Sequence, residues 1–284
     1  MPMALIVGDS GITGDRAIEV FRGKTLKLGY DCEQESAHAK AAARFTAHQD
    51  GVDLILFCIP ESLNRAEKYL EEIRHASRRV IVYAHERRAS SVVAVDYLKK
   101  GLAHGYVAGE GPIEESMEEL VLSLCVYGHP HYPRIDFKQP EGGRAPCVFI
   151  STPFEHSTMM VARGAIQYPL QELGFEVKLE GRDYWRCLQS QIVSDIQSSS
   201  LLVANVSLDP RNLLHNANVY FEAGVATALG LPIIFVRKRN EMSIALPADV
   251  QGRLWLSYDN EIDLALKLFC GLRQSIRRSA GAAG

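Results

Sequence analysis

The chain has 284 residues, of which 47% are hydrophobic and 23% charged, with a formal net charge of −3. This composition matches ordinary globular proteins, and the length allows about two domains that each bury a core. The small negative charge, without a lysine–arginine run, argues against a nucleic-acid partner, because neutralising phosphates requires a basic face.

The first half alternates short apolar runs with helical stretches. Runs over residues 4–7, 53–59 and 80–84 have the length and composition of buried strands. Helices are predicted over 15–28, 36–49, 62–75, 91–100 and 113–127. This alternation predicts a doubly wound parallel sheet, and we assign residues 1–128 to a first domain.

A glycine-rich turn follows the first predicted strand, with Gly8, Gly11 and Gly14 at intervals of three. Such a turn can cradle a phosphate on its backbone N–H groups. The spacing matches neither the dinucleotide fingerprint nor a P-loop. A tight strand-to-helix turn is therefore the favoured interpretation.

Residues 96–106 and 111–120 resemble the last third of a response-regulator receiver domain. The resemblance implies a phosphoacceptor aspartate at the end of the third strand, where this chain has Cys58, and a lysine just after Tyr106, where Val107 follows. Of the receiver's acidic pair only Asp9 is present. Phosphoryl transfer needs the nucleophile, the metal-binding acids and the cation together. We therefore predict a pseudo-receiver that serves regulation or dimerisation.

Residues 129–145 contain three prolines and two adjacent glycines with little apolar periodicity, which predicts a linker. His129 and His131 have no acid or cysteine at ligand spacing, so solvated histidines are favoured over a metal site. No metal is predicted elsewhere.

The alternation of strands and helices resumes in residues 146–284, the predicted second domain. Strands are predicted over 147–150, 175–179, 201–206, 233–236 and 254–256, and helices over 157–173, 184–199 and 261–276, with another of about three turns beginning near residue 218. The chain is thus predicted to be α/β, with two flavodoxin-like, doubly wound parallel-sheet domains in tandem.

The helix that begins near residue 218 carries an acid on its apolar side. Asn218 is the predicted N-cap, and Gly230 is where a left-handed residue would end the helix. Spacings of three and four residues place Glu222 on one stripe with Val219, Ala223, Ala226 and Leu229. Burying an ionised acid is costly, so it needs a partner or a working cavity. One interpretation pairs it with an arginine (Arg163, Arg182 or Arg186), and the favoured one places it in a cavity.

Three segments of the second half, 147–154 (CVFISTPF), 201–207 (LLVANVS) and 218–224 (NVYFEAG), resemble the nucleoside 2-deoxyribosyltransferase-like family. That family overlaps in fold with Toll/interleukin-1 receptor (TIR)-like domains, and the resemblance covers about half of the chain. It implies that Glu222 attacks, or stabilises charge at, the anomeric carbon of a ribosyl group. The implied activity is N-glycosidic cleavage or (deoxy)ribosyl transfer on a nucleoside, nucleotide or NAD, without a cofactor. The longer insertion at 209–217 leaves hydrolysis and transfer both open.

Ligands of open parallel sheets bind beyond the carboxyl ends of the strands, which selects further candidates. Asp209 is assigned a catalytic role beside Glu222, either orienting it or holding a sugar hydroxyl, although Asp-Pro also starts turns. The predicted substrate-binding residues flank the first strand and the helix start: Ser151, Thr152, Phe154, Asn216 and Asn218. Helix capping is the alternative for Ser151, Thr152 and Asn218. Tyr184 and Trp185 are candidates for an aromatic wall around a base, with core packing the favoured role of Trp185.

An alternative function is nucleotide sensing without turnover, in which the pseudo-receiver is a regulatory or dimerisation surface. Receiver-like domains commonly pair through their last strands and helices, so we expect a homo-oligomer. Tyr97, Leu98, Leu102, Tyr106 and the helix over 113–127 would supply the contact. In the competing interpretation the apolar stripe of that helix covers its own sheet.

Six scattered cysteines without a C-x-x-C pair predict reduced core residues rather than disulfides or zinc ligands. The sequence has no signal peptide and no apolar run of about 18 residues, so we expect no membrane partner and a cytoplasmic location.

Overall fold

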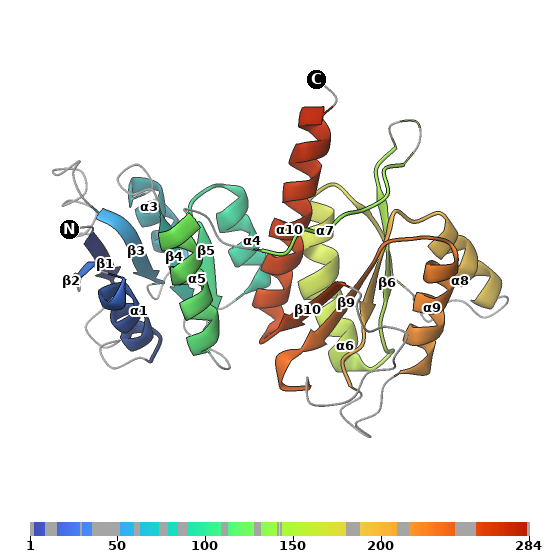
Figure 1. Ribbon diagram of the computed structural model, residues 1–284, viewed down its shortest axis with the longest axis horizontal. Helices are drawn as coiled ribbons and strands as arrows, with labels where there is room; N and C mark the ends of the chain where they lie inside the picture. Colours follow the sequence, from blue (N-terminus) through green and yellow to red (C-terminus); the bar gives the residue numbers. More distant parts are fainter. Residues whose placement is uncertain are drawn as a thin grey trace. The chain divides into compact units, whose positions relative to one another are not determined.

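The computed structural model divides into two units, Met1–His131 and Tyr132–Gly284, and each contains a five-stranded parallel sheet (Figure 1). The structure describes residues 3–8, 16–28, 30–35, 52–59, 63–73, 79–84, 90–108, 113–127, 132–140, 142, 144–179, 188–208, 216–241 and 254–282. The prediction of an α/β chain with two tandem parallel-sheet domains is confirmed.

The first sheet has the strand order β2-β1-β3-β4-β5, the order of a doubly wound, flavodoxin-like sheet. Its strands are β1 (Met3–Val7), β2 (Asp31–Glu35), β3 (Val52–Cys58), β4 (Val80–Ala84) and β5 (Gly105–Ala108). Its helices are α1 (Arg16–Lys27), α3 (Leu63–Ile73), α4 (Ser91–Lys99) and α5 (Ile113–Tyr127). The helix predicted over 36–49 and the glycine-rich turn after Gly8, including Asp9, lie outside the described residues.

Sequence patterning missed strand β2 because it is polar, with the sequence DCEQE. This strand forms one edge of the sheet and pairs in parallel with β1 alone. An edge strand is less buried than a central one, so it does not need the apolar run of a central parallel strand.

One hydrophobic core cluster of the first unit lies between the sheet and the helices α1 and α5, which contact each other. The apolar residues of α5 (Met117, Leu120, Val121 and Leu124) pack in this core with alternate residues of the strands. The stripe therefore covers its own sheet, as in the competing interpretation above. Tyr97, Leu98, Leu102 and Tyr106 are also buried. These buried side chains do not form an exposed surface for pairing. Homo-oligomerisation itself stays a prediction.

A histidine takes part in the backbone pairing at the start of β5. The N–H of Val80 donates to Nδ1 of His104 at 3.1 Å, while the N–H of His104 donates to the carbonyl of Val80 at 2.7 Å. Burial, followed by the charge of Arg79, lowers the pKa of His104 from its usual 6.5. Because Nδ1 accepts a hydrogen bond, the neutral ring is the form that fits.

We expect the first unit to lose stability as the pH falls below about 6.5, because the unfolded histidine binds a proton more readily than the folded one. The stabilisation is fully present above the unfolded pKa and is lost as the pH falls toward the folded one. His104→Asn keeps an acceptor close to the Nδ1 position but does not titrate. Thermal unfolding at pH 7.5 and 5.5 should show a larger fall in melting temperature for wild type than for this variant. Equal falls would contradict this expectation.

The second sheet has the order β10-β9-β8-β6-β7, which is the same doubly wound arrangement. Its strands are β6 (Cys147–Ser151), β7 (Glu176–Leu179), β8 (Leu201–Asn205), β9 (Ile233–Lys238) and β10 (Leu254–Tyr258). The helices are α6 (His156–Val161), α7 (Tyr168–Glu172), α8 (Leu188–Gln197), α9 (Ala217–Ala228) and α10 (Glu261–Ala282), with a short 3₁₀ turn η5 (Arg239–Glu241) after β9. Helices α8 and α9 cover one face of this sheet, and α6, α7 and α10 lie on the other (Figure 1).

The helix predicted over 157–173 is present but is interrupted by a π-helical segment, η4 (Ala162–Gln167), between α6 and α7. The N–H of Tyr168 donates to the carbonyl of Arg163, five residues earlier. Pro169 follows directly, and its ring would clash with the carbonyl of Ala165 in a regular helix. The wider turn accommodates the proline without ending the helix.

Part of the segment predicted as a linker packs on the second unit. The N–H of Ile135 donates to the carbonyl of Gly271 on α10 at 3.5 Å, and the N–H of Lys138 donates to the carbonyl of Ser200 at 2.9 Å. Ile135 is fully buried, and Phe137 contacts Phe175 edge to face. Residues 132–138 therefore belong structurally to the second unit.

Two glycines in helices of this unit should respond oppositely to alanine. A Cβ at Gly271 would lie 2.5 Å from the backbone oxygen of Pro133, whereas a Cβ at Gly224 would meet nothing within 4 Å. Gly224→Ala should raise stability by about 0.5–1 kcal/mol through helix propensity alone. Gly271→Ala should lower it by about 1–3 kcal/mol, because a backbone segment must move. Denaturant unfolding of both variants measures the difference, and a stabilised Gly271→Ala would show that the segment 132–138 does not pack as described.

No helix within the described ranges is both long and apolar enough to cross a membrane. Among those same residues there is no cluster of three or more potential metal ligands. His129 and His131 lie outside them.

Candidate functional site

Helix α9 carries the acid singled out from the sequence, and Asn216 begins it. The side chain of Asn216 accepts a hydrogen bond from the N–H of Asn218 at 2.9 Å. Asn216, and not the predicted Asn218, is therefore the N-cap, and Asn218 is exposed in the first turn. The sequence offered two asparagines two residues apart, and both are good capping residues.

The buried stripe of α9 is the predicted one over most of its length. Val219, Glu222, Ala223 and Ala226 are buried. Leu229, which was placed on the same stripe, is instead 43% exposed, because the helix ends there. Gly230 follows with a φ of 65°, which confirms the left-handed residue expected at the helix end.

Glu222 is only 3% exposed, and Ser151 at the end of β6 donates its hydroxyl proton to Oε2 of the carboxylate. Ser151 is itself fully buried. The contact joins residues 71 positions apart in the sequence. A hydrogen bond to a carboxylate is stronger than one between neutral groups, so it holds the side chain of Glu222 in place at the carboxyl edge of the sheet.

The last residues of β6 face opposite sides of this sheet. Phe149 packs with the core beneath α8 and α9, so Ser151, two residues on, faces the same helices. The register pairs Ser151 with Ala204 of β8, which brings the residue that follows each of them, Thr152 and Asn205, together. Nδ2 of Asn205 donates to Oγ1 of Thr152 at 3.1 Å.

From Asn205 the hydrogen bonds continue to the edge of the sheet. The N–H of Ser207 donates to Oδ1 of Asn205 at 3.2 Å, and the hydroxyl of Ser207 lies 3.0 Å from that of Tyr258 at the end of β10. All four residues are buried (Thr152, Asn205, Ser207 and Tyr258). We call them the edge chain. The carboxyl ends of three strands are thus linked by side chains.

Burial raises the pKa of Tyr258 to about 12, although its hydrogen bond with Ser207 acts in the opposite direction. The phenol therefore stays neutral at physiological pH. Nearby, the N–H of Leu208 donates to Oε2 of Glu241 at 3.1 Å, so a second carboxylate lies at this edge of the sheet.

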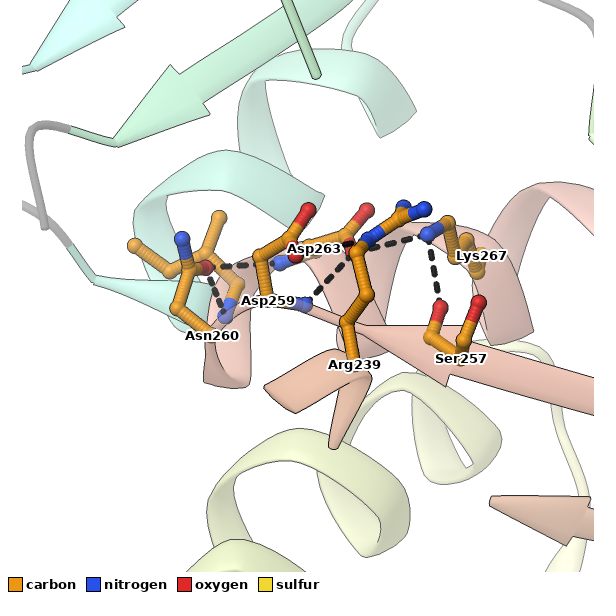
Figure 2. Close-up of polar contacts among 7 residues, drawn as sticks. Arg239, Ser257, Asp259, Asn260, Asp263 and Lys267 are labelled. Carbon is orange, nitrogen blue, oxygen red and sulfur yellow. Dashed lines mark hydrogen bonds and ion pairs between the residues drawn. The ribbon is translucent and has the colours of Figure 1, made fainter. Parts of the chain in front are cut away.

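Charged residues fix the ends of β9 and β10 (Figure 2). Nε of Arg239 lies 2.8 Å from Oδ1 of Asp259, whose side chain is 2% exposed. Oδ2 of Asp263 accepts from the N–H of Asp259 at 3.1 Å and from Nζ of Lys267 at 2.7 Å. Lys267 also donates to the carbonyl of Ser257 at 2.8 Å. Tyr258 lies between two residues that this network holds.

A buried cation, which sequence reasoning missed, lies near the end of β9. Arg237 is 2% exposed, and its guanidinium carbon is 5.7 Å from the ring centroid of Trp255, which stacks on Phe235. Burial raises the pKa of Tyr220 on α9, and the positive charge of Arg237 counteracts this. The side of the site beneath α9 thus combines a carboxylate, a guanidinium and aromatic rings. An arginine directly after the apolar run IIFV was the available signal.

The remaining predicted site residues fall into two groups. Phe154 is partly buried in the loop after β6, and Asn216 and Asn218 lie at the start of α9. Asp209, Tyr184 and Trp185 lie outside the described residues, as do Arg182 and Arg186, two of the arginines considered as partners of Glu222. Arg163, the third, is exposed.

Cys58, which the receiver resemblance places at the phosphoacceptor position, is buried at the end of β3. Burial suits a small apolar side chain at this position.

No protein-family model matches the sequence, and no curated protein matches it significantly. Among solved structures, the chain is similar to a CMP N-glycosidase from Clostridium botulinum, with 21% identity, a TM-score of 0.35 and coverage of 44% of this chain and 99% of the other. It is also similar to the C-terminal domain of glucosamine-fructose-6-phosphate aminotransferase from Francisella tularensis (10% identity, TM-score 0.30, 99% and 85% covered). A third is the catalytic subunit of cobaltochelatase from Mycobacterium tuberculosis (12% identity, TM-score 0.28, 98% and 28% covered). With TM-scores this low, these likenesses do not bear on what this chain binds or does.

Proposed function

We propose that the second unit cleaves the N-glycosidic bond of a nucleoside, nucleotide or NAD, by hydrolysis or by (deoxy)ribosyl transfer, with Glu222 as the carboxylate at the anomeric carbon. The observation that carries the proposal is a buried carboxylate, 3% exposed and hydrogen-bonded by Ser151, at the carboxyl edge of a doubly wound sheet. Ligands of such sheets bind at that edge.

N-glycosidic cleavage passes through a state with positive charge on the sugar, and a negative carboxylate beneath C1′ stabilises that charge. The bond between C1′ and the base nitrogen breaks, and its electron pair leaves with the base. In hydrolysis, water supplies a hydroxyl to C1′, and its other proton goes to the departing base of a nucleoside or nucleotide, or to the solvent when neutral nicotinamide leaves NAD. In transfer, the nitrogen of a second base takes the place of water. Glu222 serves both routes, either as the nucleophile or as the stabilising charge.

The sequence resemblance of 147–154, 201–207 and 218–224 supports this assignment, because Ser151, Asn205 and Glu222 lie in those three segments. Hydrogen bonds within the protein involve the hydroxyls of Ser151 and Thr152, so we assign these residues first to positioning and only then to substrate contact. Asp209 follows Leu208 directly and is proposed to hold a sugar hydroxyl or to orient Glu222. Phe154, Asn216 and Asn218 are proposed to border the substrate.

The first unit is proposed to act as a regulatory or dimerisation domain in a homo-oligomer, without phosphoryl chemistry of its own. No metal or cofactor is needed for the proposed cleavage.

The test is to incubate the full-length protein with nucleosides, nucleoside monophosphates and NAD, and to separate the products by chromatography. Release of a free base from at least one substrate is the expected result. A labelled second base in the same reaction separates transfer, which forms a new nucleoside, from hydrolysis. Binding of a nucleotide without base release would favour the alternative sensing function. If the protein neither binds any of these compounds nor releases a base from them, the proposal is overturned.

A further inference from the structure

Thr152 and Asn205 of the edge chain lie on the face of the second sheet opposite to Glu222, and the proposed reaction does not use them directly. We propose that Asn205 is a positioning residue, which fixes Thr152 on one face of the sheet and thereby holds Ser151 against Glu222 on the other. This inference rests on the proposed function of Glu222 for its effect on rate.

Asn205 is fully buried, and both ends of its amide are used. Nδ2 donates to Thr152 from β6, and Oδ1 accepts from the backbone of Ser207 after β8. The amide orientation is therefore fixed by an acceptor just after β6, Thr152, and a donor just after β8, Ser207. A hydrophobic residue, which is usual in a central parallel strand, would make neither bond.

The coupling to the carboxylate follows from the alternation along β6. Ser151 and Thr152 share a peptide unit, and their hydroxyls serve opposite faces, toward Glu222 and Asn205 respectively. A backbone rotation that released Thr152 would also turn the side chain of Ser151. The hydrogen bond that holds the hydroxyl of Thr152 thus restricts the orientation of the Ser151 side chain.

Hydrogen bonds also hold the end of the edge chain at Tyr258. Tyr258 meets Ser207 through its hydroxyl. On either side of it, Lys267 holds the carbonyl of Ser257 and Asp263 holds the N–H of Asp259 (Figure 2). The support for Thr152 therefore extends to the end of β10 and the first turns of α10.

The first arm of the experiment is kinetic, with the full-length protein and the substrate that releases most base. Thr152→Val removes the acceptor of Asn205 at nearly constant volume, and Thr152→Ser restores it. Asn205→Leu removes the amide, and the double variant tests whether the two residues act together. Ser199→Ala is the matched control, because Ser199 is a buried hydroxyl at the opposite, amino edge of the same sheet.

We expect Thr152→Val and Asn205→Leu to lower kcat about tenfold to a hundredfold with KM changed less, because misplacing a catalytic group reduces rate more than binding. Thr152→Ser should recover most of the rate lost in Thr152→Val, and Ser199→Ala should stay within about twofold of wild type. The double variant should be no slower than Asn205→Leu alone, since both changes break one interaction. Should Asn205→Leu fail to fold, Thr152→Val carries the test, and a wild-type kcat in Thr152→Val would overturn the proposal.

The second arm is a crystal structure of Thr152→Val, which does not depend on activity. Loss or lengthening of the contact between Ser151 and Glu222 is expected, and an unchanged contact would overturn the positioning role whatever the kinetics show. The failure of the proposed function looks different, because wild type itself would then release no base. The crystal structure alone would then decide whether Asn205 positions Ser151.

Discussion

Glu222→Gln should reduce base release at least about a hundredfold while leaving the fold intact. The amide keeps the volume of the side chain and an oxygen that accepts from Ser151, but it removes the negative charge that would stabilise the sugar cation. Steady-state release of base, followed by chromatography, measures the loss. Retention of more than about a tenth of wild-type turnover would defeat the catalytic assignment.

Glu241→Gln is the matched control for this substitution. Glu241 also lies at the carboxyl edge of the second sheet, where it accepts from the N–H of Leu208, and glutamine can keep that contact. We expect turnover within about threefold of wild type, because the charge removed is not the one assigned to the anomeric carbon. A structural role for Glu222 would appear instead as a lowered melting temperature in Glu222→Gln that exceeds the change in Glu241→Gln.

The second large effect is expected from Ser151→Ala, which should lower kcat about tenfold to a hundredfold. Removing the hydroxyl deprives the buried carboxylate of this donor, and hydrogen bonds to charged groups contribute about 1.5–3 kcal/mol. Ser151→Cys retains the size and a weak donor, so its rate should lie between those of wild type and Ser151→Ala.

The measurement is the turnover of the three proteins at saturating substrate, with thermal unfolding as a control for folding. If Ser151→Ala turns over within twofold of wild type, the hydrogen bond to Glu222 does not contribute to the reaction. An order in which Ser151→Cys is slower than Ser151→Ala would also contradict the role given to the donor.

Much of the fold was predictable because buried parallel strands and the helices between them leave strong signals. The predicted runs 53–59, 80–84, 147–150 and 201–206 became strands whose ends differ from the prediction by at most one residue, and the run 233–236 became β9, which extends two residues further to Lys238. Edge strand β2 was missed, since a polar edge strand has no such run. The helix cap was placed on the wrong asparagine because local propensity does not distinguish Asn216 from Asn218.

The site was predictable only in part, for a physical reason. The burial of Glu222 follows from a helical period within one segment, and the meeting of strand ends follows from parallel topology. The partners across the sheet do not follow from either. Asn205 and Tyr258 meet Thr152 and Ser207 only because of strand register, which the sequence does not specify at single-residue resolution.

Chemical rescue tests the central claim most directly, namely that Glu222 acts at the anomeric carbon. Glu222→Ala should release almost no base, and added azide or formate should restore release, because the small anion enters the space of the lost carboxylate and reaches C1′. With azide, the sugar product should carry azide at C1′, whereas Glu241→Ala should turn over like wild type and show no acceleration. Release of base by Glu222→Ala at the wild-type rate without added anion would contradict the account.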